Sequence, residues 1–197
     1  MFAIETLDRA NGFPQIAVDP KSRRLYVTWS DYRHGDLDVF LSSSEDGGKH
    51  WTEPTRVNND PLHNGADQFF QWLAVDPVDG AINVIFYDRR IDPRNHKQIV
   101  VLARSTDQGH TFNNYAWTDE AFEAGGVFFG DYTGLAAFAG RVYGVWTEKP
   151  TAPPSSDEKS QAEGGKEAKP RPRGTVVKLG TADFTGEIHS GTSKPGS

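Results

Sequence analysis

The chain has 197 residues, a formal charge of -6 and no cysteine. That length suits one domain with a hydrophobic core, the lack of cysteine excludes disulfides and thiolate metal sites, and the negative charge argues against nucleic acid as the main partner. No apolar run approaches the roughly 20 residues of a membrane span, and the opening MFAIETLDRANGF lacks the basic start, apolar stretch and cleavage site of a secretion signal.

Short runs rich in β-branched and aromatic residues recur along the chain, bounded by turn dipeptides such as Asp-Pro, Asp-Gly and Ala-Gly. That composition is typical of strands, and no segment shows a helical period. In chain order, the first eight expected strands are 13–18, 24–30, 37–44, 52–58, 69–75, 81–87, 97–105 and 113–118. We therefore predict an all-β protein.

The strands are organised in repeats. PQIAVDPKSRRLYVTWSD (Pro14–Asp31) aligns with QWLAVDPVDGAINVIFYD (Gln71–Asp88) at an offset of 57 (Asp76 minus Asp19), and YTGLAAFAGRVYGVWTE (Tyr132–Glu148) aligns with the second copy at an offset of 60. Four antiparallel strands per repeat of about 60 residues are typical of the blades of a β-propeller. A β-sandwich is the alternative, but it does not require turns of the same chemistry at the same place in successive units.

Two turns share one spacing of a serine, an aspartate, a glycine and an aromatic residue. They are Ser44-x-Asp46-x-Gly48-x-x-Trp51 and Ser105-x-Asp107-x-Gly109-x-x-Phe112. In such a turn the carboxylate accepts bonds from backbone N–H groups, the glycine permits a positive φ, and the aromatic ring packs the hairpin against its sheet. We therefore predict a structural role, with catalysis or calcium binding at the two aspartates as the alternatives.

These two motifs resemble the Asp-box of the sialidase and BNR-repeat β-propellers, and the resemblance covers most of Phe13 to Glu148. It implies a propeller of the six-bladed sialidase type, of which this chain is a partial arc of about three four-stranded blades. We expect the chain to be the C-terminal part of a longer member, with the missing blades supplied by upstream sequence or by self-association. Such an open arc would expose residues such as Ile16, Val18 and Leu135.

The repeats predict the boundaries of the structural units. In chain order these are the outer strand of a preceding blade (1–12), a blade with an Asp-box at 44–51 (13–60), a blade with an Asp-box at 105–112 (61–118), a degenerate blade (119–189) and a flexible tail (190–197). The degenerate blade has Thr185 where the glycine belongs. It also contains a disordered insertion at 149–174, which has no aromatic or branched aliphatic residue to bury.

One rim of the expected propeller collects the loops that follow second and fourth strands, opposite the Asp-boxes. Asp31, Asp88 and Glu148 end the three second strands there. Three carboxylates on one rim suit general acid–base catalysis, whereas their recurrence in every blade is what turn capping requires. Both roles are open.

Tyr132 begins the first strand of the third blade. A turn at Ala139-Gly140 pairs that strand with the next and brings Tyr132 within about one residue of opposite Glu148. The resemblance to sialidases implies catalysis by such a pair, with tyrosine as the nucleophile. Packing in the sheet is the alternative.

The resemblance implies a glycan-handling propeller, with exo-α-sialidase activity, a glycoside hydrolase reaction, in the full-length protein. Its implied catalytic residues are Tyr132, Glu148 and Asp88. Substrate binding is assigned to Arg33, Arg89, Arg90, Asp31 and Asp131. The three arginines are chosen because guanidinium groups are natural clamps for a carboxylate. The chain lacks the Phe/Tyr-Arg-Ile-Pro segment of true sialidases, so a non-catalytic propeller that binds glycan or protein on the same rim is the alternative.

Other classes of site have less support. His34, His63 and His96 lie in the same loops without the paired spacing of a metal site, and the turn DPVDG lacks the calcium-loop spacing. We expect no metal and no cofactor. The expected partner is a glycan or another small carbohydrate, not nucleic acid, and the localisation is unknown, although the resemblance implies secreted or periplasmic full-length relatives.

Overall fold

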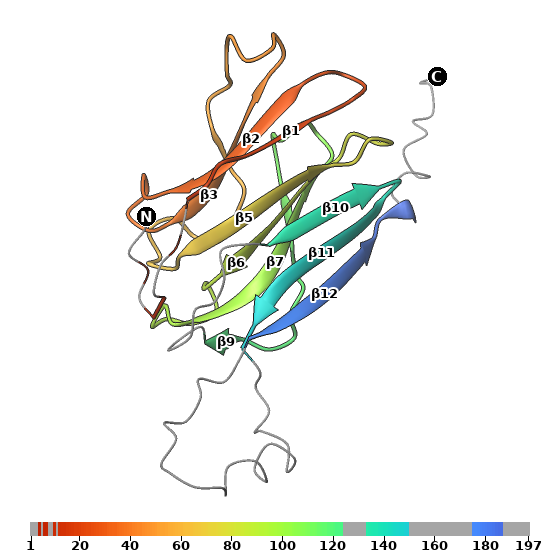
Figure 1. Cartoon of the computed structure of the whole chain (residues 1–197). Coiled ribbons are helices and arrows are strands. Elements are labelled where there is room, and N and C mark those ends of the chain that lie inside the picture. Colours follow the sequence, from red (N-terminus) through yellow and green to blue (C-terminus); the bar gives the residue numbers. More distant parts are fainter. Residues whose placement is uncertain are drawn as a thin grey trace, which may run out of the picture.

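The computed structural model describes residues 4, 6–7, 10, 12–123, 133–149 and 175–186. These residues form three antiparallel sheets that follow one another along the chain (Figure 1). The first sheet consists of β1 (Gln15–Val18), β2 (Leu25–Asp31), β3 (Asp38–Ser44) and β4 (Thr55–Arg56). The second consists of β5 (Gln68–Val75), β6 (Ile82–Asp88), β7 (Lys97–Ser105) and β8 (Asn113–Ala116), with β9 (Phe122–Glu123) paired to β7. The third consists of β10 (Gly134–Phe138), β11 (Arg141–Glu148) and β12 (Val176–Asp183).

Each sheet is a meander, because consecutive strands along its path pair with one another. The turns that join first and second strands share one chemistry. Asp19 Oδ1 accepts the backbone N–H of Lys21 (2.9 Å), and Asp76 Oδ1 accepts that of Val78 (2.8 Å). An aspartate bonded to the backbone two residues on is a stable turn by itself. The repeated Asp-Pro of the sequence is therefore a repeated turn geometry.

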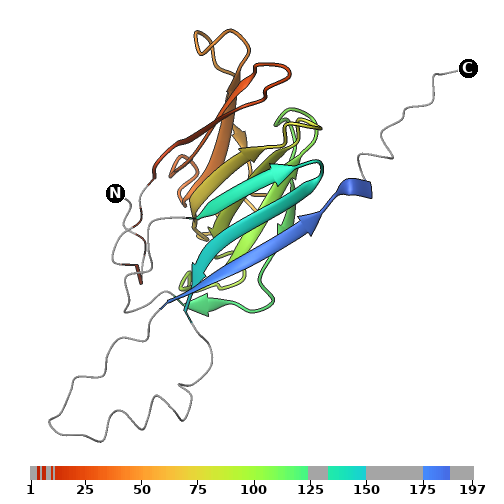
Figure 2. The ribbon, with the colours of Figure 1, turned by 45° about the vertical axis from the view of Figure 1, so that its right-hand side comes forward.

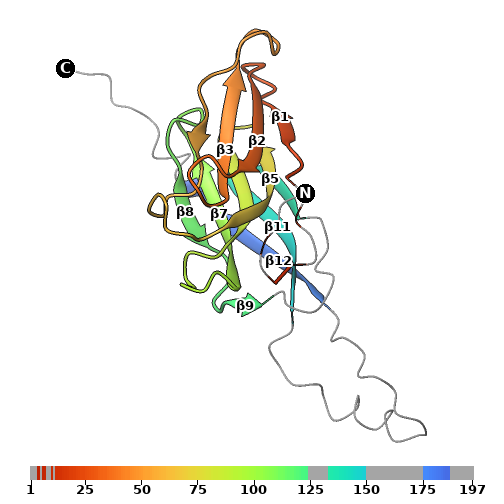
Figure 3. The same cartoon turned by 90° about the vertical axis from the view of Figure 1, so that its left-hand side faces the viewer.

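The second sheet lies between the first and the third (Figures 1 and 2). β5 contacts β1 and β2 of the first sheet and β10 of the third. β8, the last strand on the path of the second sheet, lies on the side of the molecule away from β1 (Figure 3). The first strands of the sheets are thus neighbours and the later strands spread outward, as in blades around an axis.

Two hydrophobic clusters fill the spaces between the sheets. Tyr26 of the first sheet belongs to one cluster with Val84 of β6. Ile85 of β6 belongs to the other with Trp146 of the third sheet. Successive side chains of a strand point to opposite faces, so β6 serves both clusters and is buried along its whole length.

Residues near the start of the chain also reach the core. Ile4 and Ala10 are buried in the cluster that contains Phe69 and Trp146; they belong to the segment 1–12, for which we expect the outer strand of a preceding blade. The insertion, Lys149 apart, and the tail at 190–197 lie outside the described residues.

Leu135 and the start of β5 differ from the sequence-based expectations. Leu135 is partly buried against the cluster between the second and third sheets, so its expected exposure is wrong. The reason is strand alternation: Leu135 points inward, and Phe138 is exposed on the opposite face. The register of β5 against β6 shifts between Phe69 and Trp72, where Phe70 has a φ of 52°. No turn residue in the sequence indicates this bulge.

Candidate functional site

Alternating strand directions place the connecting loops on two rims. The β3–β4 and β7–β8 turns, which hold the expected Asp-boxes, lie on one rim, which we call the box rim. The loops 31–37, 57–67 and 89–96 and the end of β11 lie on the other, which we call the loop rim. The described residues with an expected catalytic or substrate-binding role all lie on the loop rim.

At the first box, the Asp46 carboxylate is bonded to its own turn. Its Oδ1 accepts hydrogen bonds from Ser44 Oγ (2.9 Å) and from the backbone N–H of His50 (2.9 Å). Ser44 Oγ in turn accepts the N–H of Gly48 (2.9 Å), whose φ of 90° glycine adopts without strain. Trp51 donates its Nε1 hydrogen to the Gly48 carbonyl (3.0 Å).

The second box repeats these contacts. Asp107 Oδ1 accepts hydrogen bonds from Ser105 Oγ (2.7 Å) and from the backbone N–H of Thr111 (3.0 Å), and Gly109 N–H donates to Ser105 Oγ (2.9 Å). Phe112 packs against the cluster between the first and second sheets. Both boxes use their polar groups inside the turn, and we propose a structural role for them.

Asp107 gives this structural role a pH dependence. Burial alone would raise the pKa of Asp107, but hydrogen bonds from Thr111, Ser105 and His110 lower it to about 2, from an ordinary value of 3.8. A carboxyl with a lowered folded-state pKa stabilises the fold above its unfolded pKa, and this contribution is lost as the pH falls through the folded pKa.

Asp107→Asn is therefore expected to lower the melting temperature at neutral pH by about 2–4 °C. Between about pH 4 and about pH 2, the melting temperature of the variant should decrease less with falling pH than that of the unaltered chain. Circular dichroism melts across that pH range measure both effects. Any ligand that the unaltered chain binds should be bound equally well by the variant. Unchanged melting together with lost binding would make the box a ligand site instead.

The three carboxylates that end the second strands have different partners. Asp31 Oδ2 accepts a hydrogen bond from Trp29 Nε1 (2.7 Å), and Glu148 Oε1 accepts one from Trp146 Nε1 (2.7 Å). In the first and third sheets the acid thus holds the indole two residues before it. The second sheet has no tryptophan at that place, and Asp88 is buried among other polar groups.

Asp88 is enclosed by Arg90 and Gln68. Its Oδ2 lies 2.7 Å from Arg90 Nε and 2.6 Å from Arg90 Nη2, and its Oδ1 lies 3.2 Å from Gln68 Nε2. Burial raises the pKa of Asp88 above its ordinary value, against the opposing effect of Arg90. A raised carboxyl pKa suits acid–base chemistry, but here the two partners occupy both oxygens.

Arg33 lies on the exposed loop after β2. Its Nε and Nη2 lie 2.9 Å and 2.6 Å from the two oxygens of Asp31, and its guanidinium stacks over the Phe40 ring at 4.2 Å. Burial alone would raise the pKa of Asp31, but hydrogen bonds from Arg33 and Trp29 hold that pKa below its ordinary value. The neighbouring Tyr32 side chain is exposed.

Arg89 and Arg90 have different neighbours, although they are consecutive. Arg90 Nη2 reaches Asn114 Oδ1 on β8 (3.0 Å). Arg89 is fully buried, with Nε 3.3 Å from Gln98 Oε1 and the guanidinium over the Phe69 ring at 5.1 Å. The three arginines assigned to substrate binding therefore belong to three separate sets of contacts.

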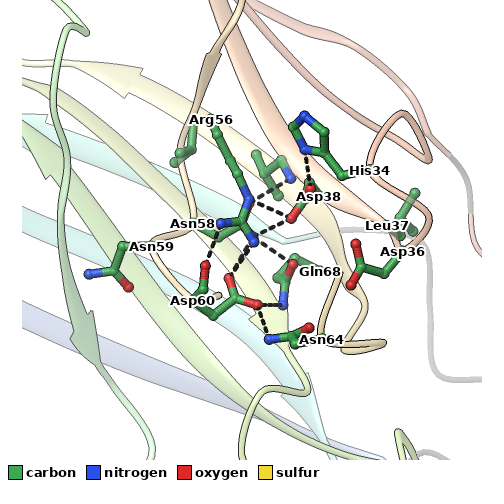
Figure 4. Close-up of polar contacts among 12 residues, drawn as sticks. His34, Asp36, Leu37, Asp38, Arg56, Asn58, Asn59, Asp60, Asn64 and Gln68 are labelled. Atoms are coloured by element: carbon green, nitrogen blue, oxygen red, sulfur yellow. Dashed lines mark hydrogen bonds and ion pairs between the residues drawn. The ribbon is translucent and has the colours of Figure 1, made fainter. Parts of the chain in front are cut away.

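A buried polar network lies beneath the loop rim between the first and second sheets (Figure 4). Arg56 on β4 donates to Asp38 on β3 (Nε–Oδ1 2.6 Å) and to Asp60 (Nη2–Oδ1 2.9 Å). Asn58 Nδ2 lies 2.7 Å from oxygens of Asp38, Asp60 and Gln68. The network links β3 and β4 to the β4–β5 connection and to β5, so it joins the two sheets.

The network contains more buried carboxylates than guanidinium groups. Its carboxylates are Asp38, Asp60 and Asp88, and its guanidinium groups are those of Arg56 and Arg90. His34 adds a further contact, with Nδ1 2.8 Å from Asp38 Oδ2. Buried carboxylates need partners to offset their lost hydration. Each guanidinium group of the network therefore stabilises the fold.

Sequence reasoning selected Asp88 and Arg90 but missed the rest of the network. The missed members are Asp38, Arg56, Asn58, Asp60 and Gln68. The polar run NNDPLHNGADQ is a signal for Asn58, Asp60 and Gln68 alone, and it does not indicate which side chains are buried. Tyr132 and Asp131 lie outside the described residues, so the pairing of Tyr132 with Glu148 stays a prediction.

Two features are absent from the described residues. In ranges 12–123, 133–149 and 175–186 and the few described positions before them, no group of three His, Cys, Asp or Glu side chains is arranged to hold a metal ion. Within the same residues, no helix is long and apolar enough to cross a membrane.

No protein-family model and no curated protein matches the sequence. Solved structures match in fold. An α-L-arabinanase of Penicillium chrysogenum complexed with arabinobiose has a TM-score of 0.54 and 19% identity, over 74% of this chain and 43% of that one. A Hadza microbial sialidase has a TM-score of 0.50 and 16% identity, over 69% of this chain and 32% of that one. An α-L-arabinofuranosidase of Fusarium graminearum complexed with an iminosugar inhibitor has a TM-score of 0.50 and 14% identity, over 75% and 43%.

The chain spans less than half the length of these structures. At such low identity the similarity concerns the fold. It confirms the prediction of an all-β, sialidase-like propeller fold, which the described residues build as an arc of three antiparallel sheets.

Proposed function

We propose that this chain is part of a glycan-handling propeller and that its loop rim binds the glycan. The first support is the fold, which the chain shares with an α-L-arabinanase and a sialidase. The second is the loop rim itself, whose loops are anchored by the buried network around Arg56 and Asn58. Loops already held in one conformation lose little entropy when a ligand binds.

Of the two finer functions, glycan binding without catalysis is favoured over exo-α-sialidase hydrolysis. The observation that carries this choice is the separation of Arg33, Arg89 and Arg90 into three sets of contacts. A sialic-acid carboxylate is held best by guanidinium groups that converge on it. Asp31 and Glu148 also each use an oxygen to hold a tryptophan.

Tyr32 and Arg33 are the residues we assign to contact with the glycan. The Tyr32 side chain is 41% exposed on the loop rim, and a tyrosine ring offers both an apolar face and a polar hydroxyl. Arg33 is held between Asp31 and the Phe40 ring, so its exposed edge has a fixed orientation. A sugar needs this combination of stacking surface and oriented donors.

Tyr32→Ala is expected to weaken glycan binding about tenfold or more, the loss typical of a central aromatic contact. Neutral and sialylated oligosaccharides, arabinobiose among them, are screened first, and the bound one is titrated by calorimetry. Trp51→Ala is the matched control, because Trp51 is 42% exposed but lies on the box rim. Equal losses in both variants, or no binding by the unaltered chain, would contradict the proposal.

A fluorogenic sialoside distinguishes binding from catalysis. No turnover is expected from this chain. Turnover that Tyr132→Phe abolishes would contradict a purely binding role and favour the exo-α-sialidase function, with Tyr132, Glu148 and Asp88 as its catalytic residues.

A further inference from the structure

The first and third sheets each expose an apolar face. The leading face, on the first sheet, consists of the exposed Ile16 and Val18 on β1 with the partly buried Leu25 and Val27 on β2. The trailing face, on the third sheet, consists of the exposed Phe138, Tyr143, Val177 and Leu179 with the partly buried Val145. Exposure reaches 67% at Ile16 and 82% at Leu179. Apolar side chains gathered on one face mark an interaction surface.

The leading face matches a face that is buried elsewhere in the same chain. At the repeat offset of 57, Ile16 corresponds to Leu73 and Val18 to Val75. Leu73 is buried in the cluster between the first and second sheets, and Val75 packs against it. The second sheet therefore uses this face to pack on the sheet before it.

The trailing face also matches a face that is buried elsewhere in the same chain, on the opposite side of the second sheet. Val177 pairs with Thr147 across β11 and β12, as Val100 pairs with Tyr87 across β6 and β7. Val100 and Tyr87 are buried in the cluster between the second and third sheets. The second sheet therefore uses this face to pack on the sheet after it. In each of these contacts the leading face of one sheet packs on the trailing face of the sheet before it, so the two kinds of face fit one another.

We propose that two copies of this chain associate head to tail, with the trailing face of each on the leading face of the other. Three sheets from each copy make a ring of six, within the four to eight blades that propellers use. The chain covers 43% of the matched α-L-arabinanase, so two copies supply about one such propeller. Contacts between two different faces form a closed assembly when their rotations complete a turn.

Light scattering coupled to size-exclusion chromatography tests the proposal on the full chain. The expected mass is twice the 21.8 kDa of one chain. Leu179→Asp on the trailing face and Ile16→Asp on the leading face should each weaken the dimer by about 100-fold, because each buries an unpaired charge in the contact. Leu62→Asp is the control, since Leu62 is 52% exposed but lies on the loop rim.

Mixing the two variants tests the head-to-tail geometry. An equimolar mixture of Leu179→Asp and Ile16→Asp still offers one unaltered pair of faces, so it should contain more dimer than either variant alone. Dichroism melts of both variants check that these exposed positions leave the fold intact. A monomer at tens of micromolar would overturn the proposal and leave the faces to other polypeptide segments. A dimer that only one of the two substitutions disrupts, or that mixing does not restore, would also overturn it.

Discussion

Replacing Arg56 by alanine is expected to lower the free energy of unfolding by about 3–5 kcal/mol. Arg56 donates to Asp38 (2.6 Å) and to Asp60 (2.9 Å), and both carboxylates are buried. Without the guanidinium, two carboxylates keep the cost of lost hydration and lose the cation that offsets it. Denaturant titration followed by tryptophan fluorescence measures the change.

Arg141→Ala is the matched control for Arg56→Ala. Arg141 forms an ion pair with Asp183 (3.6 Å) in which both side chains are more than half exposed. Exposed pairs of this kind contribute about 0–1 kcal/mol. If both variants lost the same free energy of unfolding, the buried network would not stabilise the fold. The contact between the first and second sheets would then depend on its apolar cluster alone.

Replacing Gly144 by alanine is expected to lower the free energy of unfolding by about 2–3 kcal/mol, the cost of overfilling a packed core. An added Cβ would overlap the Trp117 ring, with Cη2 only 2.9 Å away, and would lie 3.1 Å from Ile85 Cδ1. Trp117 cannot move freely, because it stacks on Trp146 with ring centroids 5.7 Å apart. The measurement is again denaturant titration.

Gly186→Ala controls for the general effect of the added methyl group. Nothing lies within 4 Å of the position that the added Cβ would occupy. The free energy of unfolding of Gly186→Ala should therefore stay within about 0.5 kcal/mol of that of the unaltered chain. Gly180→Ala provides a second case, because Gly180 pairs with Gly144 across β11 and β12 and its Cβ would meet the Trp146 ring. If Gly144→Ala proved as stable as Gly186→Ala, the close approach of Trp117 to the third sheet would be wrong.

Most strands were predictable because their signals are local. β2 and β6 stand out by their β-branched and aromatic residues, and the Asp-Pro turns at Asp19 and Asp76 close the hairpins with their own side chains. The fourth strands were predicted too long. β4 comprises only Thr55–Arg56 against the expected 52–58, although its partner β3 is seven residues long. Thr52 and Val57 still donate to the Ser43 and Val39 carbonyls of β3, but regular pairing covers only two residues.

The candidate site was predictable in part. Its rim and its charged residues, Asp31, Asp88 and Arg90 among them, follow from the order of strands and loops. The sequence could not indicate that Arg89 is buried while the adjacent Arg90 lies against β8. That difference depends on which strands of the second sheet each side chain meets, β5 and β7 for Arg89 and β8 for Arg90.

The amino-acid sequence by itself determined the all-β class, the three repeats and the chemistry of the turns, because strand period and turn residues act over a few positions. Only the tertiary structure decided which polar groups are partners. Arg56 meets Asp38 across 18 residues, and Arg90 meets Asn114 across 24. Such contacts depend on how strands far apart in the sequence are placed within a sheet: β3 beside β4 for Arg56, and the end of β6 close to β8 for Arg90. No local pattern encodes that placement.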